Sequence, residues 1–200
     1  MFDCHVHSNF SFDGKSEPGL YCEKAIEHGL EGIIFTDHLD YDFPGYDSAL
    51  TMDFTAYMKA LEELATRFYP KLEVHRGIEV GIQPHVIEKT LQVVQSYPFD
   101  YVLASIHILD GEDPYNDIYY QNKSKLQAYS RYLEEVLYMA NHFEGFDAAG
   151  HLDYIIRNAK YDDRSLRYAD HEDLLDSIFK VLIASGKGFE INTGSYRKGS

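Results

Sequence analysis

The chain has 200 residues, of which 44% are hydrophobic and 26% charged, with only 14 Gly and 6 Pro. This composition excludes a disordered, collagen-like or disulfide-rich chain. Acidic residues outnumber basic ones 33 to 18, so the formal net charge is -15. Nucleic-acid binding without sequence preference and attachment to membranes through basic residues are both disfavoured, because each needs a cationic surface. No apolar run approaches the roughly 20 residues that span a bilayer.

The N-terminus and the cysteines together predict a cytoplasmic protein. The first five residues, Met-Phe-Asp-Cys-His, carry polar and acidic groups where a signal peptide would be apolar. Cys4 and Cys22 lie in different predicted elements and form no C-x-x-C pair. We therefore expect two buried free thiols and no disulfide.

Short apolar runs alternate with longer amphipathic runs along the whole chain. The predicted strands cover 2–6, 32–36, 72–80, 99–108, 147–150 and 189–192. The predicted helices cover 18–28, the segment that follows an N-cap at Asp53, 84–95, 125–142 and 170–185. Apolar strands that alternate with helices indicate a parallel sheet covered by helices, hence an α/β fold in one domain, 1–200. The alternation alone is compatible with an open doubly wound sheet and with a closed barrel.

Five of the six predicted strands end in residues that can bind a metal ion. These residues are His5 and His7, His38, Glu79, His107 and His151. In a closed parallel barrel the strand ends open onto one face, where such folds place their active sites. An open sheet would spread six strand ends over a line of about 25 Å. The distribution of the ligand residues therefore favours the barrel.

The spacing of the first pair explains how it could bind a cation. His5 and His7 are two residues apart on a strand, so both imidazoles point to the same side. One such pair is weak evidence, but burying polar groups at five strand ends without partners would cost roughly 1–3 kcal/mol each. Imidazole combined with carboxylate suits Zn, Fe or Mn rather than Ca. We expect a solvated surface position for the remaining histidines, namely His28, His75, His85, His142 and His171. Asp40, Asp42 and Asp47 are interpreted as a solvated acidic loop, with a place at the rim of the cavity as the alternative.

The order of the motifs along the chain resembles one known family. It is similar to the polymerase and histidinol phosphatase (PHP) family, and most similar to the histidinol-phosphatase branch. The segments that carry the resemblance are His5-x-His7, Ser11-Phe12-Asp13-Gly14, Thr36-Asp37-His38, Gly77-Ile78-Glu79, Ser105-Ile106-His107, Gly150-His151-Leu152-Asp153 and 189–199. The resemblance implies a distorted (β/α)7-type barrel with a trinuclear metal centre.

The resemblance also implies which residues hold the metals. The three implied sites are His5, His7 and Glu79; Glu79, His107 and His151; and Asp13 with His38. Asp13 stands where some relatives have histidine. The implied cofactors are two or three divalent transition metals, with Zn, Fe and Mn as candidates.

Phosphate binding is implied for two arginines. Arg197 follows the sixth predicted strand, and its family counterpart is a phosphate ligand. Arg157 lies six residues after His151 and is a second candidate by the same resemblance. A planar guanidinium suits phosphate because it can donate two parallel hydrogen bonds. Arg197 and Arg157 are, with Glu79, the implied catalytic residues.

The implied activity is the metal-dependent hydrolysis of L-histidinol phosphate in histidine biosynthesis. The expected partner is a small-molecule phosphate monoester, with neither nucleic acid nor a membrane involved. Three alternatives stay open: a different PHP phosphoesterase acting on a phosphotyrosine protein, a nucleotide or another small phosphate; a non-catalytic metal-binding remnant; and an amidohydrolase barrel. The last usually has a bridging lysine on a middle strand, and no predicted strand here ends in one.

One departure from the family pattern concerns the C-terminus. Family members continue past the Arg-Lys-Gly segment to a seventh strand that ends in an Asp-x-His pair of ligands. The present sequence ends at Ser200. We therefore expect six of the seven strand units in an apparently truncated chain that lacks two of the family's metal ligands.

Overall fold

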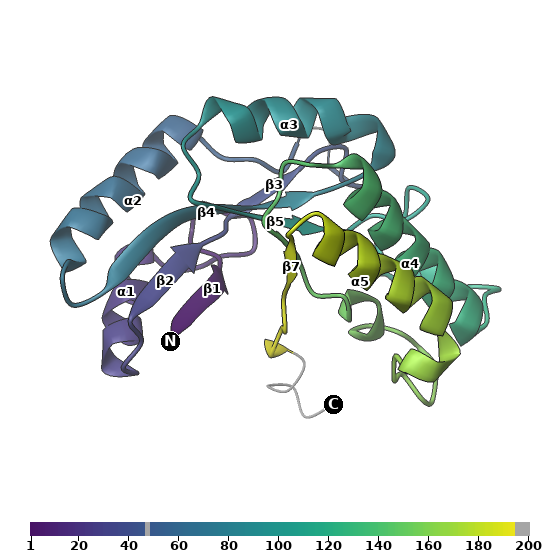
Figure 1. Ribbon diagram of the computed structural model, residues 1–200. Coiled ribbons are helices and arrows are strands. Elements are labelled where there is room, and N and C mark those ends of the chain that lie inside the picture. The colour runs from purple at the N-terminus through teal and green to yellow at the C-terminus, as the bar shows by residue number, and fades with distance from the viewer. Residues whose placement is uncertain (47–48, 195–200) are drawn as a thin grey trace. The chain divides into compact units, whose positions relative to one another are not determined.

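The computed structural model describes residues 1–46 and 49–194 (Figure 1). The chain divides into two compact units, the first made of Met1–Val80 and Lys89–Leu103 and the second of Gly81–Glu88 and the residues from Ala104 onward. The single domain over 1–200 stays a prediction.

The first unit contains parallel strands whose register determines where the site residues lie. Its strands are β1 (Phe2–Val6), β2 (Gly32–Phe35), β4 (Glu73–Gly81) and the short β3 (His38–Asp40), which pairs with β4. Val6 is paired with Phe35, and Phe35 with Arg76, in two parallel ladders. The end of β1, the end of β2 and the middle of β4 therefore lie at one level. The residues that follow these three points form one edge of the sheet.

Two helices of the first unit begin with the signals that the sequence predicts. They are α1 (Pro18–Glu27) and α2 (Phe54–Phe68). Pro18 stands in the first turn of α1, where its missing N–H costs nothing. The Asp53 side chain accepts a hydrogen bond from the Ala56 N–H at 3.0 Å and so caps α2. The helix that follows β4, α3 (Ile87–Ser96), begins after a 3₁₀ turn, Pro84–Val86.

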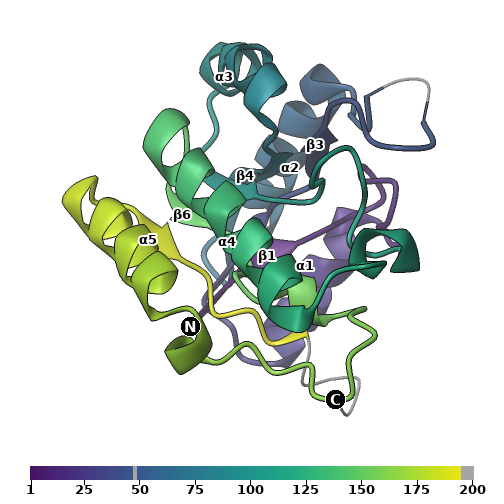
Figure 2. The ribbon, with the colours of Figure 1, turned by 90° about the vertical axis from the view of Figure 1, so that its right-hand side faces the viewer.

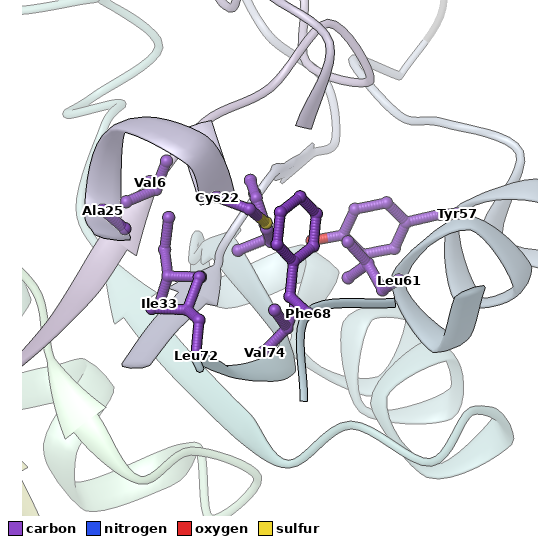
Figure 3. Packing of buried hydrophobic residues seen from close by; sticks show 10 residues of the cluster. Val6, Cys22, Ala25, Ile33, Tyr57, Leu61, Phe68, Leu72 and Val74 are labelled. Atoms are coloured by element: carbon purple, nitrogen blue, oxygen red, sulfur yellow. The ribbon is translucent and has the colours of Figure 1, made fainter. Parts of the chain in front are cut away.

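The core of the first unit lies between these helices and the strands (Figure 3). Cys22 and Ala25 from α1 and three residues of α2 pack on strand residues. The buried cluster is Val6, Cys22, Ala25, Ile33, Phe35, Tyr57, Leu61, Phe68, Leu72 and Val74. Helices α1 and α2 therefore cover one face of β1, β2 and β4.

The two thiols differ in their surroundings. Both cysteines are free, as predicted, but only Cys22 is buried, and burial raises the pKa of its thiol to about 11. Cys4 is exposed. The prediction of a buried Cys4 was wrong because the residues of β1 from Phe2 to Cys4 are all exposed to solvent.

The second unit combines short strands with two long helices. Its elements include β6 (Ala148–Ala149), β7 (Gly188–Phe189), α4 (Lys125–His142), α5 (Glu172–Ala184) and the 3₁₀ helices η2 (Asp117–Tyr120), η3 (Tyr154–Ile156) and η4 (Tyr168–Asp170). Strand β5 (Tyr101–Ser105) contributes its last two residues to this unit, where the Gly150 N–H donates to the Ala104 carbonyl at 2.8 Å. Strands β6 and β7 are parallel, and α4 and α5 lie side by side (Figure 2).

Strand β1 and the helices match their predicted ranges closely, whereas β5, β6 and β7 are shorter than the predicted ranges. Helix α4 begins at Lys125 after a Ser124–Gln127 capping box, at the predicted position. Strands β6 and β7 have only two residues each. Strand β3 was not predicted, since three residues carry no periodic signal. Within the described ranges, no helix combines the length and apolar character needed to cross a membrane.

A buried tyrosine joins the core of the first unit to the strand edge. The Tyr57 hydroxyl is fully buried and donates to the Gly77 carbonyl at 3.0 Å, two residues before Glu79. The substitution Tyr57→Phe removes this hydroxyl and leaves the Gly77 carbonyl with one donor fewer. We therefore expect the free energy of unfolding to fall by about 1–3 kcal/mol. Urea denaturation measures this loss. Tyr69→Phe, at a side chain that is 74% exposed, is the control and should leave the midpoint unchanged.

Candidate metal centre

Two histidines and a glutamate converge at the strand edge of the first unit. Glu79 is buried, and its Oε2 lies 3.1 Å from His5 Nε2 and 3.0 Å from His7 Nε2. The Nε2 atoms of the two histidines are 2.9 Å apart. The alternation of side chains along a strand brings His5 and His7 to the same side, as predicted. Their ligand atoms and that of Glu79 all lie within 4.8 Å of one another, so the three residues could hold one metal ion.

A second group shares His7 with the first. His7 Nδ1 lies 2.9 Å from Asp13 Oδ2, and His38 Nε2 lies 3.6 Å from the same oxygen. These three residues also offer ligand atoms within 4.8 Å of one another. The sequence-predicted residues of the first unit therefore lie together, in two adjoining groups.

The orientation of His38 is fixed by a carboxylate that the sequence analysis placed in solvent. Asp40 is only 2% exposed, and its Oδ2 lies 2.9 Å from His38 Nδ1. This leaves His38 Nε2 facing Asp13. Histidines that bind metals usually have such a carboxylate on their other ring nitrogen. The expectation of a solvated Asp40 was wrong, because Asp40 lies two residues beyond His38 on β3 and so shares its side of the strand.

The loop that carries Asp13 is held by buried side chains. Asp37, fully buried, accepts hydrogen bonds from the Ser8 N–H at 2.7 Å and from the Ser8 hydroxyl at 2.9 Å. The Ser11 hydroxyl accepts a hydrogen bond from the His38 N–H at 2.7 Å. The sequence analysis assigned no role to Asp37; its place in the Thr-Asp-His motif was the available signal.

Burial shifts the pKa values of the site's titrating groups in one direction, and hydrogen bonds with oppositely charged groups shift them in the other. Burial lowers the pKa of His7, but hydrogen bonds with Asp13 and Glu79 outweigh it and raise the pKa to about 9. Burial likewise lowers the pKa of His38, but the Glu79 charge and the hydrogen bonds with Asp13 and Asp40 raise it to about 10. Burial raises the pKa of the Asp13 carboxyl, but His38 and His7 hold it well below its usual range. Metal ligands bind in their deprotonated form, so a cation would replace the protons of these imidazoles.

The donor set fits a divalent transition metal. Imidazole nitrogens and carboxylate oxygens, arranged around shared points, are the ligands that Zn, Fe and Mn accept. Glu79 and Asp13 bring negative charge to those points. Asp40, at His38 Nδ1, holds the His38 ring in its orientation.

The second unit brings the other two predicted ligands together. His107 and His151 are buried, and their ring centroids lie 5.4 Å apart. The ring of Tyr154 lies 5.4 Å from that of His107 and 5.1 Å from that of His151. Sequence analysis missed Tyr154. Its position three residues after His151, in a 3₁₀ turn where such residues share a side, was the available signal.

Of the two candidate phosphate-binding arginines, the structure describes only Arg157. The guanidinium carbon of Arg157 lies 5.3 Å from the Tyr154 ring centroid. Its Nε is buried and makes no hydrogen bond within the described part of the chain. A buried guanidinium nitrogen without an acceptor suits an anionic ligand. Arg197 lies outside the described residues, as does Asp47.

The histidines assigned to the surface are exposed with two exceptions. His28, His85 and His142 are exposed, and His75 is half-buried. His171 is only 4% exposed, and its Nδ1 lies 3.2 Å from the Ser130 hydroxyl of α4. The surface assignment of His171 was wrong because the residue stands at the start of α5, against α4.

A protein-family model described as the PHP domain matches residues 3–194. The chain belongs to the PHP domain family. It is 36% identical over 192 residues to the "Histidinol-phosphatase" of Lactococcus lactis subsp. lactis, an alignment that covers 96% of this chain and 71% of that protein. It is 32% identical to the "Probable histidinol-phosphatase" of Clostridium acetobutylicum, over 99% of this chain and 75% of the relative.

The structural comparison gives the same family. The crystal structure of histidinol phosphate phosphatase from Lactococcus lactis superposes with a TM-score of 0.92 at 35% identity, over 96% of this chain and 73% of that one. That crystal structure is described as a complex with zinc, L-histidinol and phosphate. The superposition confirms the predicted α/β fold class of this PHP chain.

Loss of a central ligand should reduce the metal content of the protein. Glu79→Gln keeps the size of the side chain but removes the charge that two imidazoles share, so we expect fewer bound ions per chain. Elemental analysis after dialysis measures this number. His28→Ala, at an exposed histidine of the same unit, is the matched control and should retain the wild-type metal content. Equal metal content in both variants would contradict the assignment of Glu79 as a metal ligand.

The turn around Gly14 should be needed for the Asp13 group. A Cβ atom at Gly14 would collide with the backbone carbonyl of Ser8, so Gly14→Ala must displace the loop that carries Asp13. We expect this variant also to bind fewer ions than the wild type. In the control, Gly19→Ala, the new Cβ would lie 3.6 Å from Leu64, an ordinary contact. Comparison of both variants by elemental analysis and urea denaturation separates metal loss from unfolding.

Proposed function

We propose that this PHP chain is a histidinol-phosphatase, a phosphoric monoester hydrolase that converts L-histidinol phosphate to L-histidinol and phosphate. The observation that carries the proposal is the buried Glu79 carboxylate with His5 and His7 around it, in a chain 36% identical to a protein named histidinol-phosphatase. Histidine biosynthesis follows as the context of that reaction. The cytoplasmic location stays a prediction.

The proposed cofactors are two or three divalent ions among Zn, Fe and Mn. The proposed ligands are His5, His7, Asp13, His38, Glu79, His107 and His151, with Glu79 shared between sites as the family resemblance implies. When bound, such ions polarise the phosphoryl group and lower the pKa of a nearby water molecule. The bound zinc in the relative from Lactococcus lactis supports a metal-dependent reaction.

The protein's own groups have separate roles in this proposal. Glu79 supplies negative charge at a buried point and so holds His5 and His7 in one orientation. Arg157 and Arg197 are proposed to bind the phosphate group of the substrate. The buried Nε of Arg157, without an acceptor among residues 1–46 and 49–194, supports this role for Arg157.

The net charge of -15 does not argue against an anionic substrate. Charges more than about 8–10 Å away are largely screened at physiological salt. The field at a bound phosphate would therefore be set by nearby groups, which here would be the proposed cations and Arg157.

A substrate panel tests the proposed function. The purified protein, loaded in turn with zinc, iron and manganese, is assayed for phosphate release from L-histidinol phosphate, a phosphotyrosine peptide and a nucleoside monophosphate. We expect the highest kcat/KM for L-histidinol phosphate, its loss on treatment with a chelator, and its recovery when metal is restored. Arg157→Gln should raise KM, and Glu79→Gln should lower kcat.

The outcomes of this panel separate the alternatives. Preference for another ester would assign the chain to a different phosphoesterase activity of the same family. Metal binding without release of phosphate from any ester would support a non-catalytic metal-binding protein.

A further inference from the structure

The short segment 151–157 carries two residues that the proposed function uses, His151 and Arg157, with Tyr154 between them. His151 stands at its start, Tyr154 lies against the imidazoles of His151 and His107, and Arg157 stands at its end beside Tyr154. The only regular element in the segment is the three-residue 3₁₀ helix η3. One 3₁₀ turn has poor hydrogen-bond geometry and little stability of its own. Its position must therefore be fixed from outside.

Two buried tyrosine hydroxyls supply that fixation. The Tyr132 hydroxyl donates to the His151 carbonyl at 3.1 Å, and the Tyr120 hydroxyl donates to the Ile155 carbonyl at 2.8 Å. Tyr132 is fully buried and Tyr120 is 6% exposed. They come from different elements, α4 and η2. The segment is thus held at two points by hydroxyl groups from two different elements.

The same unit contains two tyrosines that serve as internal references. The Tyr119 hydroxyl donates to the Ala128 carbonyl at 2.9 Å, and the Tyr129 hydroxyl donates to the Arg164 carbonyl at 2.9 Å. Both side chains are fully buried. They therefore match Tyr120 and Tyr132 in residue type, burial and kind of partner, but neither bonds to the segment 151–157.

The His151 carbonyl connects the Tyr132 hydroxyl to the backbone of the site. The His151 carbonyl also accepts the Tyr154 N–H at 2.8 Å, which closes the turn that sets the direction of the Tyr154 ring. Loss of the Tyr132 hydroxyl would leave this carbonyl with one donor fewer in a buried place. The turn would then be free to move, together with both imidazole contacts of Tyr154.

We infer that Tyr132 and Tyr120 are positioning residues of the site: their hydroxyls hold η3 so that His151, Tyr154 and Arg157 stay in their mutual arrangement. The inference rests on the proposed function for its kinetic consequence. Its structural consequence concerns the orientation of His151 and does not depend on turnover.

Four single substitutions test the inference: Tyr132→Phe, Tyr120→Phe, Tyr129→Phe and Tyr119→Phe. Each removes one oxygen atom and one buried hydrogen bond, so all four should show a similar loss of stability in urea denaturation. The decisive readout is ¹⁵N NMR of the imidazole nitrogens in the metal-free protein. We expect the His151 and His107 signals to shift in the first two variants and to stay at their wild-type positions in the last two.

Zinc affinity and kinetics give the second readout. Substitution of groups that support metal ligands typically costs 10–100-fold in metal affinity or activity. We expect a loss of about this size in zinc affinity, and in kcat/KM for L-histidinol phosphate, for Tyr132→Phe and Tyr120→Phe, with values close to wild type for the two reference variants.

Two results would overturn the inference: unshifted imidazole signals in both Tyr132→Phe and Tyr120→Phe, or equal shifts and equal losses in all four variants. If Tyr132→Phe does not fold, Tyr120→Phe decides by the same comparison, because it acts from another element. A wild-type protein without phosphatase activity would refute the proposed function. The imidazole signals and zinc affinity would still decide the role of the two tyrosines.

Discussion

The negative charge of a carboxylate buried at the edge of a parallel sheet must be offset by nearby donors or cations. The strand edge of the first unit is arranged around this requirement. Glu79 is 1% exposed, and an unpaired charge in that position would cost several kcal/mol. The register of β1, β2 and β4 supplies compensation by bringing the imidazoles of His5 and His7 to its Oε2. His5 and His7 reach it together because strand residues two apart share a side. The sheet therefore gathers a donor set that transition metals accept.

The acidic residues of this edge have distinct tasks despite their similar chemistry. Asp13 faces the imidazoles directly, Asp40 orients one of them from behind, and Asp37 fixes the loop through Ser8. Only the first would contact a cation. The overall charge of -15 therefore says little about the field at the site, which depends on where each carboxylate lies and what it is paired with.

In the second unit, buried tyrosines hold loops in place by hydrogen bonds, as buried carboxylates do in the first unit. Tyrosine gives a large apolar ring for the core and one hydroxyl that must find an acceptor when it is buried. Several of these hydroxyls bond to backbone carbonyls of irregular segments, so the α4 region stabilises loops as well as its own packing. A chain with 17 tyrosines and no tryptophan can in this way hold long irregular connections in place.

The sequence by itself determined the helices, most strands and which positions are candidate metal ligands. Alternation of apolar residues and end signals such as Asp53 and Ser124 are local, and residues that follow strand ends are identified once the strands are known. The resemblance to the PHP family rested on the same local motifs. Their prediction needed no knowledge of which segments meet in space.

Only the tertiary structure decided which groups hydrogen-bond to the candidate ligand residues and their loops. Asp37 bonds to Ser8 across 29 positions and Tyr132 to His151 across 19, and no spacing rule links such pairs. Burial of Asp40 and exposure of Cys4 were equally beyond the sequence. The physical reason is that a hydrogen-bond partner or a covering side chain is set by the packing of distant elements, whereas periodicity reports only on neighbours along the chain.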